Sequence, residues 1–369
     1  MDTVLVTGGA GFIGRHVVHH LLKKGYTVRI LDSLVEQVHH GQKPDGLSPD
    51  AELIIGDVRD ADLLRRALHG ANAVIHLAAE VGVGQSMYAV ERYVSGNDLA
   101  TAALFEALIN RNVQRVVVAS SMSIYGEGLY RTVDGRLVEN AVRAPRLSSA
   151  TGWEPLDDKG NPLIPIPTPE WKQPSLASVY ALTKYVQEQL TLTLAGAYGM
   201  EGVALRLFNV YGSGQSLSNP YTGVLAIFAS RLLNGHRPVI FEDGLQRRDF
   251  VHVDDVARAF VMALEKPGIA GEIFNIGSGQ DRSVLDISRL LAEAMGRSGI
   301  KPEISGQGRT GDIRHCFGDV TKASTKLGFQ AKRNFSEGLS ELTQWVARQT
   351  AMDMVEEARR ELEKRGLVA

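Results

Sequence analysis

Short apolar runs rich in β-branched residues alternate with amphipathic stretches through the first 210 residues of this 369-residue chain. Runs such as "RVVVAS" (115–120) are apolar at almost every position, which is typical of strands buried on both faces of a sheet. Their alternation with helical patterns indicates an α/β protein with a doubly wound parallel sheet. Strands are expected at about 3–7, 27–32, 52–56, 72–77, 114–120 and 202–208, and helices at about 12–24, 60–69, 97–111 and 180–198.

Two segments depart from this alternation. Residues 128–174 contain "WEPLDDKGNPLIPIPTPEWKQP", whose prolines and glycines argue against any regular element. Residues 349–366 are dense in charge but carry apolar residues at helical spacing, which predicts a terminal amphipathic helix. These apolar residues are Ala351, Val355, Ala358 and Leu362.

Composition excludes several classes of protein. A net charge of −2 gives no general attraction to nucleic acid or to an anionic membrane, so we expect neither as a partner. Cys316 is the single cysteine, which rules out a disulfide framework and a thiolate metal site within one chain, and we expect no bound metal. The start "MDTVLVTGG" does not resemble a signal peptide, and no apolar run approaches the roughly 18 residues of a membrane span. We therefore expect a cytoplasmic protein.

A glycine-rich turn joins the first predicted strand to the first predicted helix in "VLVTGGAGFIGRHVV". Gly8, Gly11 and Gly14 there would allow a tight turn and a close approach of a dinucleotide pyrophosphate to the N-terminus of the helix. Asp32 ends the second predicted strand, at a spacing typical of a carboxylate that binds a ribose hydroxyl pair. A carboxylate at this position repels a 2′-phosphate, which favours NAD over NADP. Asp57 in "IIGDVRD" either lies near an adenine or serves as a helix N-cap or turn residue.

Tyr180 and Lys184 are spaced i, i+4, so they project from one face of the predicted helix. An ammonium group beside a phenol lowers the pKa of the phenol, which would make Tyr180 a general base near neutral pH. Three serines follow the buried strand that ends near residue 120. Ser120 is expected to satisfy backbone groups, and Ser123 is either a substrate contact or a turn residue.

With these features in place, the chain resembles the extended short-chain dehydrogenase/reductase family, and within it the NAD-dependent sugar-nucleotide epimerases and dehydratases. The resemblance covers roughly residues 1–340. The motifs that carry it are "TGGAGFIG", Asp32, "GDV", "HLAAE", "SSMSIYG", "YALTK", "RLFNVYG", "RRDFVHVDDVA" and "NIGSG".

The resemblance implies a division of the chain and a set of NAD-binding residues. It implies a Rossmann-like NAD-binding domain (1–208, with the insertion 128–174), a smaller mixed nucleotide-sugar-binding domain (209–345) and a C-terminal helical extension (346–369), with some later segments returning to the first domain. The residues that match NAD-binding positions are Gly8, Gly11, Phe12, Ile13, Gly14, Asp32, Ser33, Asp57, Val58, Leu77, Ala78, Ala79, Asn97, Tyr180 and Lys184.

The resemblance also assigns the chemistry. It makes Ser121 the catalytic hydroxyl beside Tyr180 and Lys184. Where the 4,6-dehydratases carry an Asp-Glu pair that eliminates water, this chain has Met122 and Ser123. Methionine transfers no proton and serine is a poor base at neutral pH, so epimerisation is favoured over dehydration.

The substrate implied is a nucleoside diphosphate sugar. The residues that match substrate-binding positions are Ser121, Ser123, Asn209, Val224, Phe241, Arg248 and Arg309, with Arg247 and Arg314 as secondary candidates. Val81 replaces a lysine that UDP-galactose 4-epimerases carry. The insertion, residues 216–235 and the C-terminal helix look most like the dTDP-L-rhamnose 4-epimerase branch. The proline-rich insertion is expected to form an ordered flap over the sugar, packed down by Trp153 and Trp171.

The sequence thus predicts an NAD-dependent nucleotide-sugar 4-epimerase, with a dTDP-6-deoxyhexose as one candidate substrate. The alternatives are a UDP-hexose or UDP-uronate 4-epimerase, another dehydratase or reductase of the family, and, remotely, a non-catalytic NAD sensor. Similar enzymes pair two helices with their symmetry mates, so we expect a homodimer through the helices at about 97–111 and 180–198.

Overall fold

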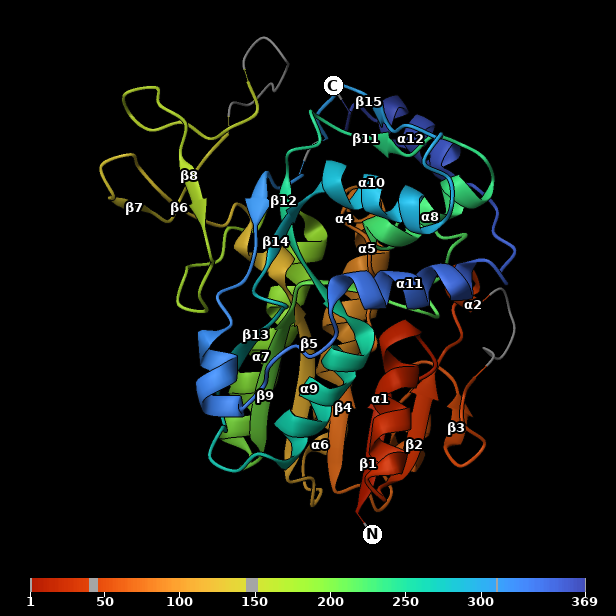
Figure 1. The fold of residues 1–369 in the computed structure, drawn as a ribbon. Helices are drawn as coiled ribbons and strands as arrows, with labels where there is room; N and C mark the ends of the chain where they lie inside the picture. Colours follow the sequence, from red (N-terminus) through yellow and green to blue (C-terminus); the bar gives the residue numbers. More distant parts are fainter. Residues whose placement is uncertain (1, 40–45, 144–151, 310, 369) are drawn as a thin grey trace.

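A computed structural model describes residues 2–39, 46–143, 152–309 and 311–368. Its centre is a seven-stranded sheet in the order β3-β2-β1-β4-β5-β9-β13, and every neighbouring pair is parallel (Figure 1). The strands are β1 (Thr3–Thr7), β2 (Thr27–Asp32), β3 (Glu52–Ile55), β4 (Ala73–His76), β5 (Arg115–Ser121), β9 (Glu201–Leu207) and β13 (Ile273–Ile276). The strand order reverses between β1 and β4, and the crevice outside the carboxyl ends of the strands at such a point is where α/β proteins bind ligands.

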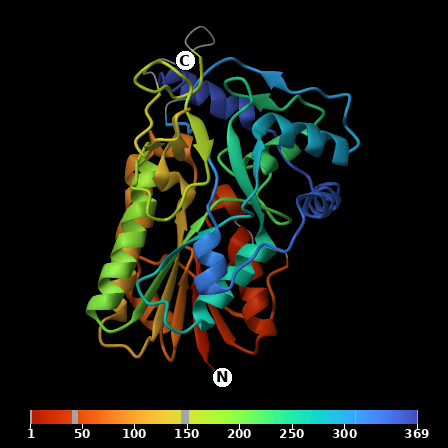
Figure 2. The same ribbon diagram turned by 60° about the vertical axis from the view of Figure 1, so that its left-hand side comes forward.

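Helices cover both faces of this sheet (Figures 1 and 2). On one face, α1 (Phe12–Lys23) packs with α9 (Val253–Glu265), and their apolar residues share one core with the sheet. On the other face lie α3 (Ala61–Ala67), α6 (Ala100–Leu108) and α7 (Val179–Ala197). The predicted strands and these helices agree with the structure to within a few residues. The segment expected as the start of a helix at 97–111 differs, because Val94–Leu99 forms a π-helical turn before α6.

The second part of the chain builds a smaller region and also completes the first. As the resemblance implied, β13 and α9 return to the large sheet from beyond residue 208. The smaller region has the mixed strands β10 (Asn209–Tyr211), β12 (Arg247–His252), β14 (Asp281–Ser283) and β16 (His315–Cys316), and the parallel pair β11 (Val239–Ile240) and β15 (Glu303–Ile304). Its core lies against α8 (Val224–Leu233), α10 (Val284–Ala294) and α11 (Phe335–Val346).

The insertion differs from its prediction. It contains a three-stranded antiparallel sheet of β6 (Leu129–Arg131), β7 (Leu137–Val138) and β8 (Ile164–Ile166), so the expectation of no regular element is wrong. Figure 1 shows this sheet projecting from the side of the molecule. Pro165 is tolerated because β8 is an edge strand that pairs with β6 alone. Trp153 is buried as expected, but Trp171 is 55% exposed and therefore does not hold the insertion against the rest of the protein.

The C-terminal region ends in α12 (Val355–Lys364), which begins six residues later than residue 349. Ala351 precedes this helix and is buried in the core of the smaller region. No helix in the described residues is long and apolar enough to cross a membrane.

Candidate active site

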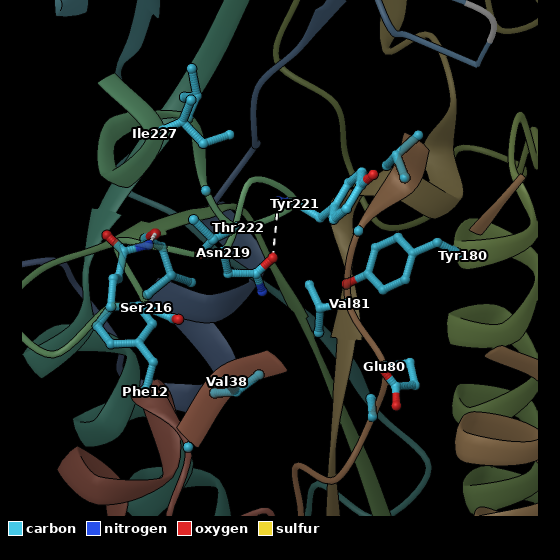
Figure 3. Close-up of a pocket in the computed structure, with 18 of the residues that line it drawn as sticks. Phe12, Val38, Glu80, Val81, Tyr180, Ser216, Asn219, Tyr221, Thr222 and Ile227 are labelled. Atoms are coloured by element: carbon cyan, nitrogen blue, oxygen red, sulfur yellow. Dashed lines mark hydrogen bonds between the residues drawn. The ribbon is translucent and has the colours of Figure 1, made fainter. Parts of the chain in front are cut away.

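A cleft of about 1010 Å³ runs from the carboxyl ends of β1, β2 and β5 to the smaller region. Figure 3 shows Tyr180 and Tyr221 pointing into it, with Glu80 and Val81 nearby. The predicted catalytic, NAD-binding and substrate-binding residues all line the cleft except Gly14 and Asn97, and the secondary candidates Arg247 and Arg314 do not line it. The chain therefore brings together residues that lie up to about three hundred positions apart.

The glycine turn fits a dinucleotide diphosphate. Gly8 has a φ of +69°, and a Cβ at Gly8 would lie 2.7 Å from the Ala78 nitrogen. A Cβ at Gly14 would lie 2.3 Å from the Gly8 carbonyl, so Gly14 serves the packing of α1 on the turn and not the cleft wall. Gly11 is the N-cap of α1 and provides no side-chain cap, which leaves the first N–H groups of the helix for an anion. These backbone positions fit NAD.

Asp32 is held in place at the end of β2. Its Oδ2 accepts a hydrogen bond from the Ala10 nitrogen at 3.0 Å and its Oδ1 accepts one from the Leu34 nitrogen at 2.9 Å. Both bonds fix the carboxylate, which lines the cleft beside Ser33. The Nε2 of His39 lies 3.8 Å from Oδ1, and the His39 side chain is buried beside the carboxylate.

Asp57 acts as a turn residue within the cleft wall. Its carboxylate accepts from the Arg59 backbone nitrogen at 2.8 Å and from the Arg59 guanidinium, and these bonds lower the pKa of Asp57. The N-cap of α3 is Asp60, which excludes the N-cap alternative for Asp57. Val58 is buried next to it and also lines the cleft.

Tyr180 lies in the first turn of α7, whose N-cap Ser178 accepts a hydrogen bond from the Ala181 nitrogen at 3.1 Å. The Tyr180 backbone nitrogen donates to Ser86 Oγ at 3.0 Å, and its ring packs edge-on against Tyr93. Burial raises the pKa of Tyr180, while a hydrogen bond with Ser121 opposes the rise. Burial thus outweighs the expected lowering of the pKa of Tyr180, because a buried site penalises the phenolate.

Lys184 is 4% exposed, and its Nζ donates to Gln187 Oε1 at 2.7 Å. Burial lowers the pKa of Lys184 to about 7, and the carboxylates of Glu188 and Asp98 oppose this shift. Burial is therefore the largest influence on the pKa of Lys184.

Lys184 belongs to a buried network that the sequence did not predict. Gln187 Nε2 donates to Thr101 Oγ1 at 2.9 Å, and His76 bonds Thr101 Oγ1 at 3.0 Å and Thr7 Oγ1 at 2.7 Å. Burial and the nearby Lys184 lower the pKa of His76 to about 3, so the imidazole stays neutral. The network contacts Lys184 through uncharged groups.

The serines at the end of β5 have separate roles. Ser121 Oγ accepts a hydrogen bond from Ser123 Oγ at 2.8 Å and another from the Ser123 nitrogen at 3.2 Å. Ser123 therefore orients Ser121, and both hydroxyls line the cleft with Met122. Ser120 Oγ donates to Glu188 Oε2 at 2.6 Å, and Glu188 also pairs with Arg206, so Ser120 makes a structural contact with a side chain and not with the backbone groups that were expected.

The far end of the cleft presents groups suited to an anion. Asn209 Oδ1 is buried without a hydrogen-bond partner in the described residues. Val224 begins α8, whose N-cap Gly223 gives no side-chain cap, so the Val224 N–H is available to an anion. The Arg309 guanidinium lies 4.3 Å from the centre of the Phe241 ring and its Nε donates to Asp312 at 2.8 Å.

Arg248 also lines the cleft, with its guanidinium oriented by backbone carbonyls. Its Nη1 donates to the carbonyls of Arg247 and Arg314, both at 2.9 Å, and its Nη2 donates to the Ile313 carbonyl. No group of three His, Cys, Asp or Glu side chains within the described ranges is placed to hold a metal ion.

Comparisons with known proteins agree with this site. The model of the NAD dependent epimerase/dehydratase family matches residues 4–277. The chain belongs to this family. Its cofactor is NAD, and it is an enzyme of the nucleotide-sugar epimerase/dehydratase type. A dTDP-L-rhamnose 4-epimerase of Burkholderia thailandensis is 36% identical over 352 residues, which cover 94% of this chain and 95% of that protein.

Two solved structures of epimerases are similar throughout. UDP-glucose 4-epimerase of Thermotoga maritima, in a structure with UDP-glucose, has a TM-score of 0.76 and 32% identity, covering 94% of this chain and 99% of the other. UDP-glucuronic acid 4-epimerase of Bacillus cereus, in complex with UDP-glucuronic acid and NAD, has a TM-score of 0.74 and 29% identity, with the same coverage.

In this epimerase/dehydratase, Asn97 lies behind the cleft wall and not in it. Its Oδ1 accepts from the Glu80 nitrogen at 2.6 Å, and its Nδ2 donates to Thr183 Oγ1 at 2.9 Å. Asn97 therefore holds the segment that carries Leu77, Ala78 and Ala79 against α7. Asn97 is fully buried and does not line the cleft, and its direct contact with NAD stays a prediction.

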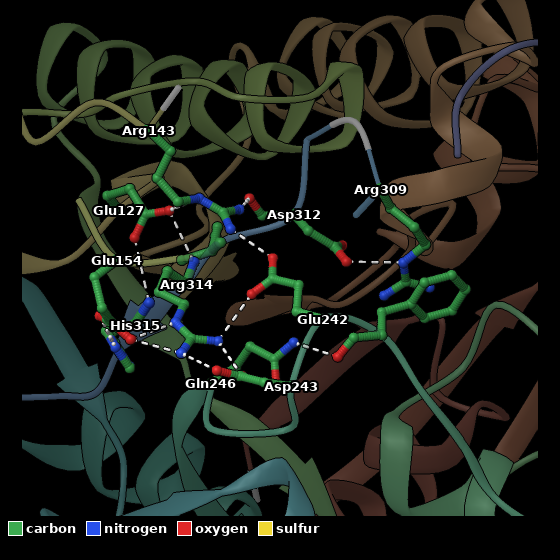
Figure 4. Close-up of polar contacts among 12 residues, drawn as sticks. Glu127, Arg143, Glu154, Glu242, Asp243, Gln246, Arg309, Asp312, Arg314 and His315 are labelled. Carbon is green, nitrogen blue, oxygen red and sulfur yellow. Dashed lines mark hydrogen bonds and ion pairs between the residues drawn. The ribbon is translucent and has the colours of Figure 1, made fainter. Parts of the chain in front are cut away.

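Two secondary candidates among the arginines have other partners. Arg314 is 1% exposed and contacts Glu154, Glu242 and Asp243 (Figure 4). Arg247 pairs with Asp281, and it does not line the cleft. Neither guanidinium is placed for a substrate.

The insertion is joined to the body by a cluster of buried ion pairs around Arg314, which we call the charge cluster: Glu127, Arg143, Glu154, Glu242, Asp243, Arg314 and His315 (Figure 4). No described residue of the insertion lines the cleft, and residues 144–151 lie outside the described part. For the described residues, the prediction of a flap over the sugar is wrong. The ion pairs fasten the insertion to the 312–315 segment and to Glu242 instead.

Proposed function

We propose that this protein is a nucleotide-sugar 4-epimerase that oxidises the C4 hydroxyl of its substrate and then reduces the 4-keto sugar from the opposite face. The observation that carries the proposal is the cluster at the end of β5. There Ser123 Oγ bonds Ser121 Oγ at 2.8 Å, Met122 lies between them in sequence, and Tyr180 and Lys184 line the same cleft.

Each residue of this cluster has a definable task. Bound NAD supplies a reversible hydride acceptor with a positive charge in its oxidised form. Tyr180 removes the proton from the C4 hydroxyl and returns it, since its hydroxyl is hydrogen-bonded to Ser121 and reaches the cleft. Ser121 donates to the sugar oxygen, and Ser123 fixes its orientation. Lys184 would hold the ribose next to the nicotinamide and favour the phenolate of Tyr180 when charged.

The same cluster disfavours elimination of water. A dehydratase needs an acid and a base beside the sugar, but Met122 has no proton to transfer. The Ser123 hydroxyl is already committed to Ser121. The groups that hydride transfer requires, Ser121, Tyr180 and Lys184, are all present, whereas the acid and the base that dehydration requires are both absent from positions 122 and 123.

The substrate proposed is a dTDP-6-deoxyhexose such as dTDP-L-rhamnose, after the 36% identical relative. The anion-binding groups Asn209, Val224, Arg248 and Arg309 support a diphosphate, and the Phe241 ring is placed near the nucleoside. A UDP-hexose or UDP-uronate is the alternative, since UDP sugars occupy the two similar structures.

The proposal is tested with purified protein and a panel of dTDP- and UDP-sugars. Proton NMR should show inversion at C4 for one nucleotide series, with no net NADH released, and the denatured protein should yield NAD. A product that has lost water, or a stoichiometric release of NADH, would contradict the proposal.

A homodimer through the exposed face of α7 and the turn before α6 is also proposed. Leu99 is 56% exposed and Leu182 is 44% exposed there, which is unusual for large apolar residues unless a partner covers them. Light scattering at micromolar concentration should give the mass of two chains, and a monomer mass would contradict this assignment.

A further inference from the structure

The C-terminal helix has an apolar face turned to the cleft. Val355, Ala358 and Leu362 lie at spacings of three and four residues on α12, and all three line the cleft, as does Leu367. Ala358 is 9% exposed and Leu362 is 6% exposed, although they lie near the end of the chain. Figure 1 shows α12 beside β11 and β15 at the end of the molecule farthest from the N-terminus.

Several contacts fasten this segment to the smaller region. Asp353 accepts from His236 Nδ1 at 2.6 Å, and Glu356 accepts from Arg231 at 2.9 Å. These partners belong to α8 and the turn after it. The base of the segment is therefore fixed beside the helix whose N-terminus faces the anion end of the cleft.

The tip of the segment is joined to the loop that carries Arg309. Arg359 Nη2 donates to Gln307 Oε1 at 2.7 Å, and Val368 forms an antiparallel backbone bridge with Arg309. Arg309 is the guanidinium that we assign to the substrate. The backbone from which it projects is thus paired directly with the end of the chain.

The segment also contacts the NAD-binding part. The δ-carbons of Leu362 lie 3.5 Å from the position that a Cβ on Gly84 would occupy. The Arg365 guanidinium lies 4.3 Å from the centre of the Tyr88 ring, and the Tyr88 hydroxyl bonds the Tyr221 hydroxyl at 2.6 Å. The segment therefore spans both walls of the cleft.

We propose that residues 353–368 form the outer wall of the nucleotide end of the cleft and position Arg309 for the substrate diphosphate. This inference rests on the proposed function. The wall fixes the backbone of Arg309 through Val368 and excludes water with Leu362 and Leu367. We expect it to contribute to binding of the nucleoside diphosphate and not to the chemical step, because its contacts are with Arg309, Arg231 and Gly84 and not with Ser121 or Tyr180.

The test compares two variants with a matched control, each as the NAD-loaded enzyme. A chain that ends at Gly366 removes Leu367 and the Val368 bridge, and Leu362→Ala keeps the full length but opens the apolar face. Arg360→Ala is the control, since Arg360 is exposed and does not line the cleft. Calorimetry measures the Kd of dTDP and, in parallel, of UDP.

We expect the Kd of whichever nucleotide the wild type binds to rise about tenfold or more in both variants, which corresponds to about 1.4 kcal/mol of lost binding. Bound NAD should stay at the wild-type amount, and with an accepted sugar nucleotide KM should rise while kcat stays within about twofold, as expected when uniform binding is lost. The control should match the wild type. Unchanged Kd values in both variants, or a fall in kcat with unchanged KM, would overturn the proposal. If the wild type binds dTDP or UDP but inverts no sugar, the proposed function fails while the Kd comparison still decides the role of the wall.

Discussion

Two buried polar regions of the molecule are built in opposite ways. Behind Lys184, the network of Gln187, Thr101, His76 and Thr7 makes uncharged hydrogen bonds. The charge cluster around Arg314 is instead made of ion pairs. The neutral network leaves the charge of Lys184 available to the reaction, whereas the charge cluster uses its charges to hold the insertion.

The difference predicts which property of the protein, activity or stability, a substitution in each region should change. A reacting group surrounded by neutral partners can be changed at little cost to folding, because no buried charge is left unpaired. Removing one partner of a buried ion pair strongly destabilises the folded protein, since the other charge remains buried without compensation. The first region should therefore report on activity and the second on stability.

The largest expected effect sharpens this comparison at the reacting end. Tyr180→Phe should lower kcat by about 100- to 10,000-fold, the usual contribution of a positioned acid–base group, while the melting temperature and bound NAD stay near wild type. Tyr198→Phe, at the exposed C-terminal end of α7, is the control and should leave kcat unchanged. Wild-type turnover by Tyr180→Phe would mean that the base is another group.

Arg314→Met tests the charge cluster. It leaves Glu242, which is 1% exposed, without one of its cationic partners, so the free energy of unfolding should fall by about 3–5 kcal/mol. Urea unfolding measures this loss, and kcat of the folded enzyme should change little. Arg136→Met removes an exposed pair with Asp158 and should cost about 0–1 kcal/mol. An equal loss of unfolding free energy in the two variants would contradict the stabilising role of the charge cluster.

A double substitution tests the choice of cofactor. NAD should bind the wild type far better than NADP, and Asp32→Ala with Ser33→Arg should narrow that gap, because it removes the carboxylate that repels a 2′-phosphate and adds a cation. Binding of both dinucleotides is measured by calorimetry on the apoenzyme. The variant should also bind NAD more weakly, since Asp32 accepts hydrogen bonds from Ala10 and Leu34. Equal affinity of the wild type for both cofactors would refute the role of Asp32.

The smallest expected effect is on the pH dependence of kcat/KM. The carboxylate of Asp98 raises the pKa of Lys184, which burial sets at about 7, so Asp98→Asn should lower that pKa further. Lys184 would then lose its charge at a lower pH, and the alkaline limb of the kcat/KM profile should move to lower pH. Asp62→Asn on the exposed face of α3 is the control. A limb that moves upward, or does not move, would contradict the assignment of Lys184.

Local patterns predicted the strands and helices of the large sheet well. The strands and the glycine turn depend on residues close in sequence, and α7 starts at the serine N-cap that precedes Tyr180. The neutral network was missed because His76 is a lone polar residue in an apolar strand and Gln187 belongs to the polar run "QEQ" of a helix, and neither pattern indicates a partner. Their contact joins positions 111 residues apart.

The rest of the site depends on contacts that no local pattern contains. Arg314 was assigned to the substrate as a secondary candidate because an isolated arginine does not reveal which carboxylates bury it. Its partner Glu154 is 160 residues away. The helix at α12 was predicted, but its place in the cleft wall was not, since an amphipathic pattern shows that one face is covered and does not show by what.

The central claim is that the hydrogen at C4 leaves the sugar as a hydride and returns to the opposite face of the same molecule. It is tested most directly with a nucleotide sugar that carries deuterium at C4, incubated with the enzyme in ordinary water. Mass spectrometry and NMR should find the C4 epimer with its deuterium retained. Deuterium replaced by solvent hydrogen in the epimer, or a product formed by loss of water, would contradict this account.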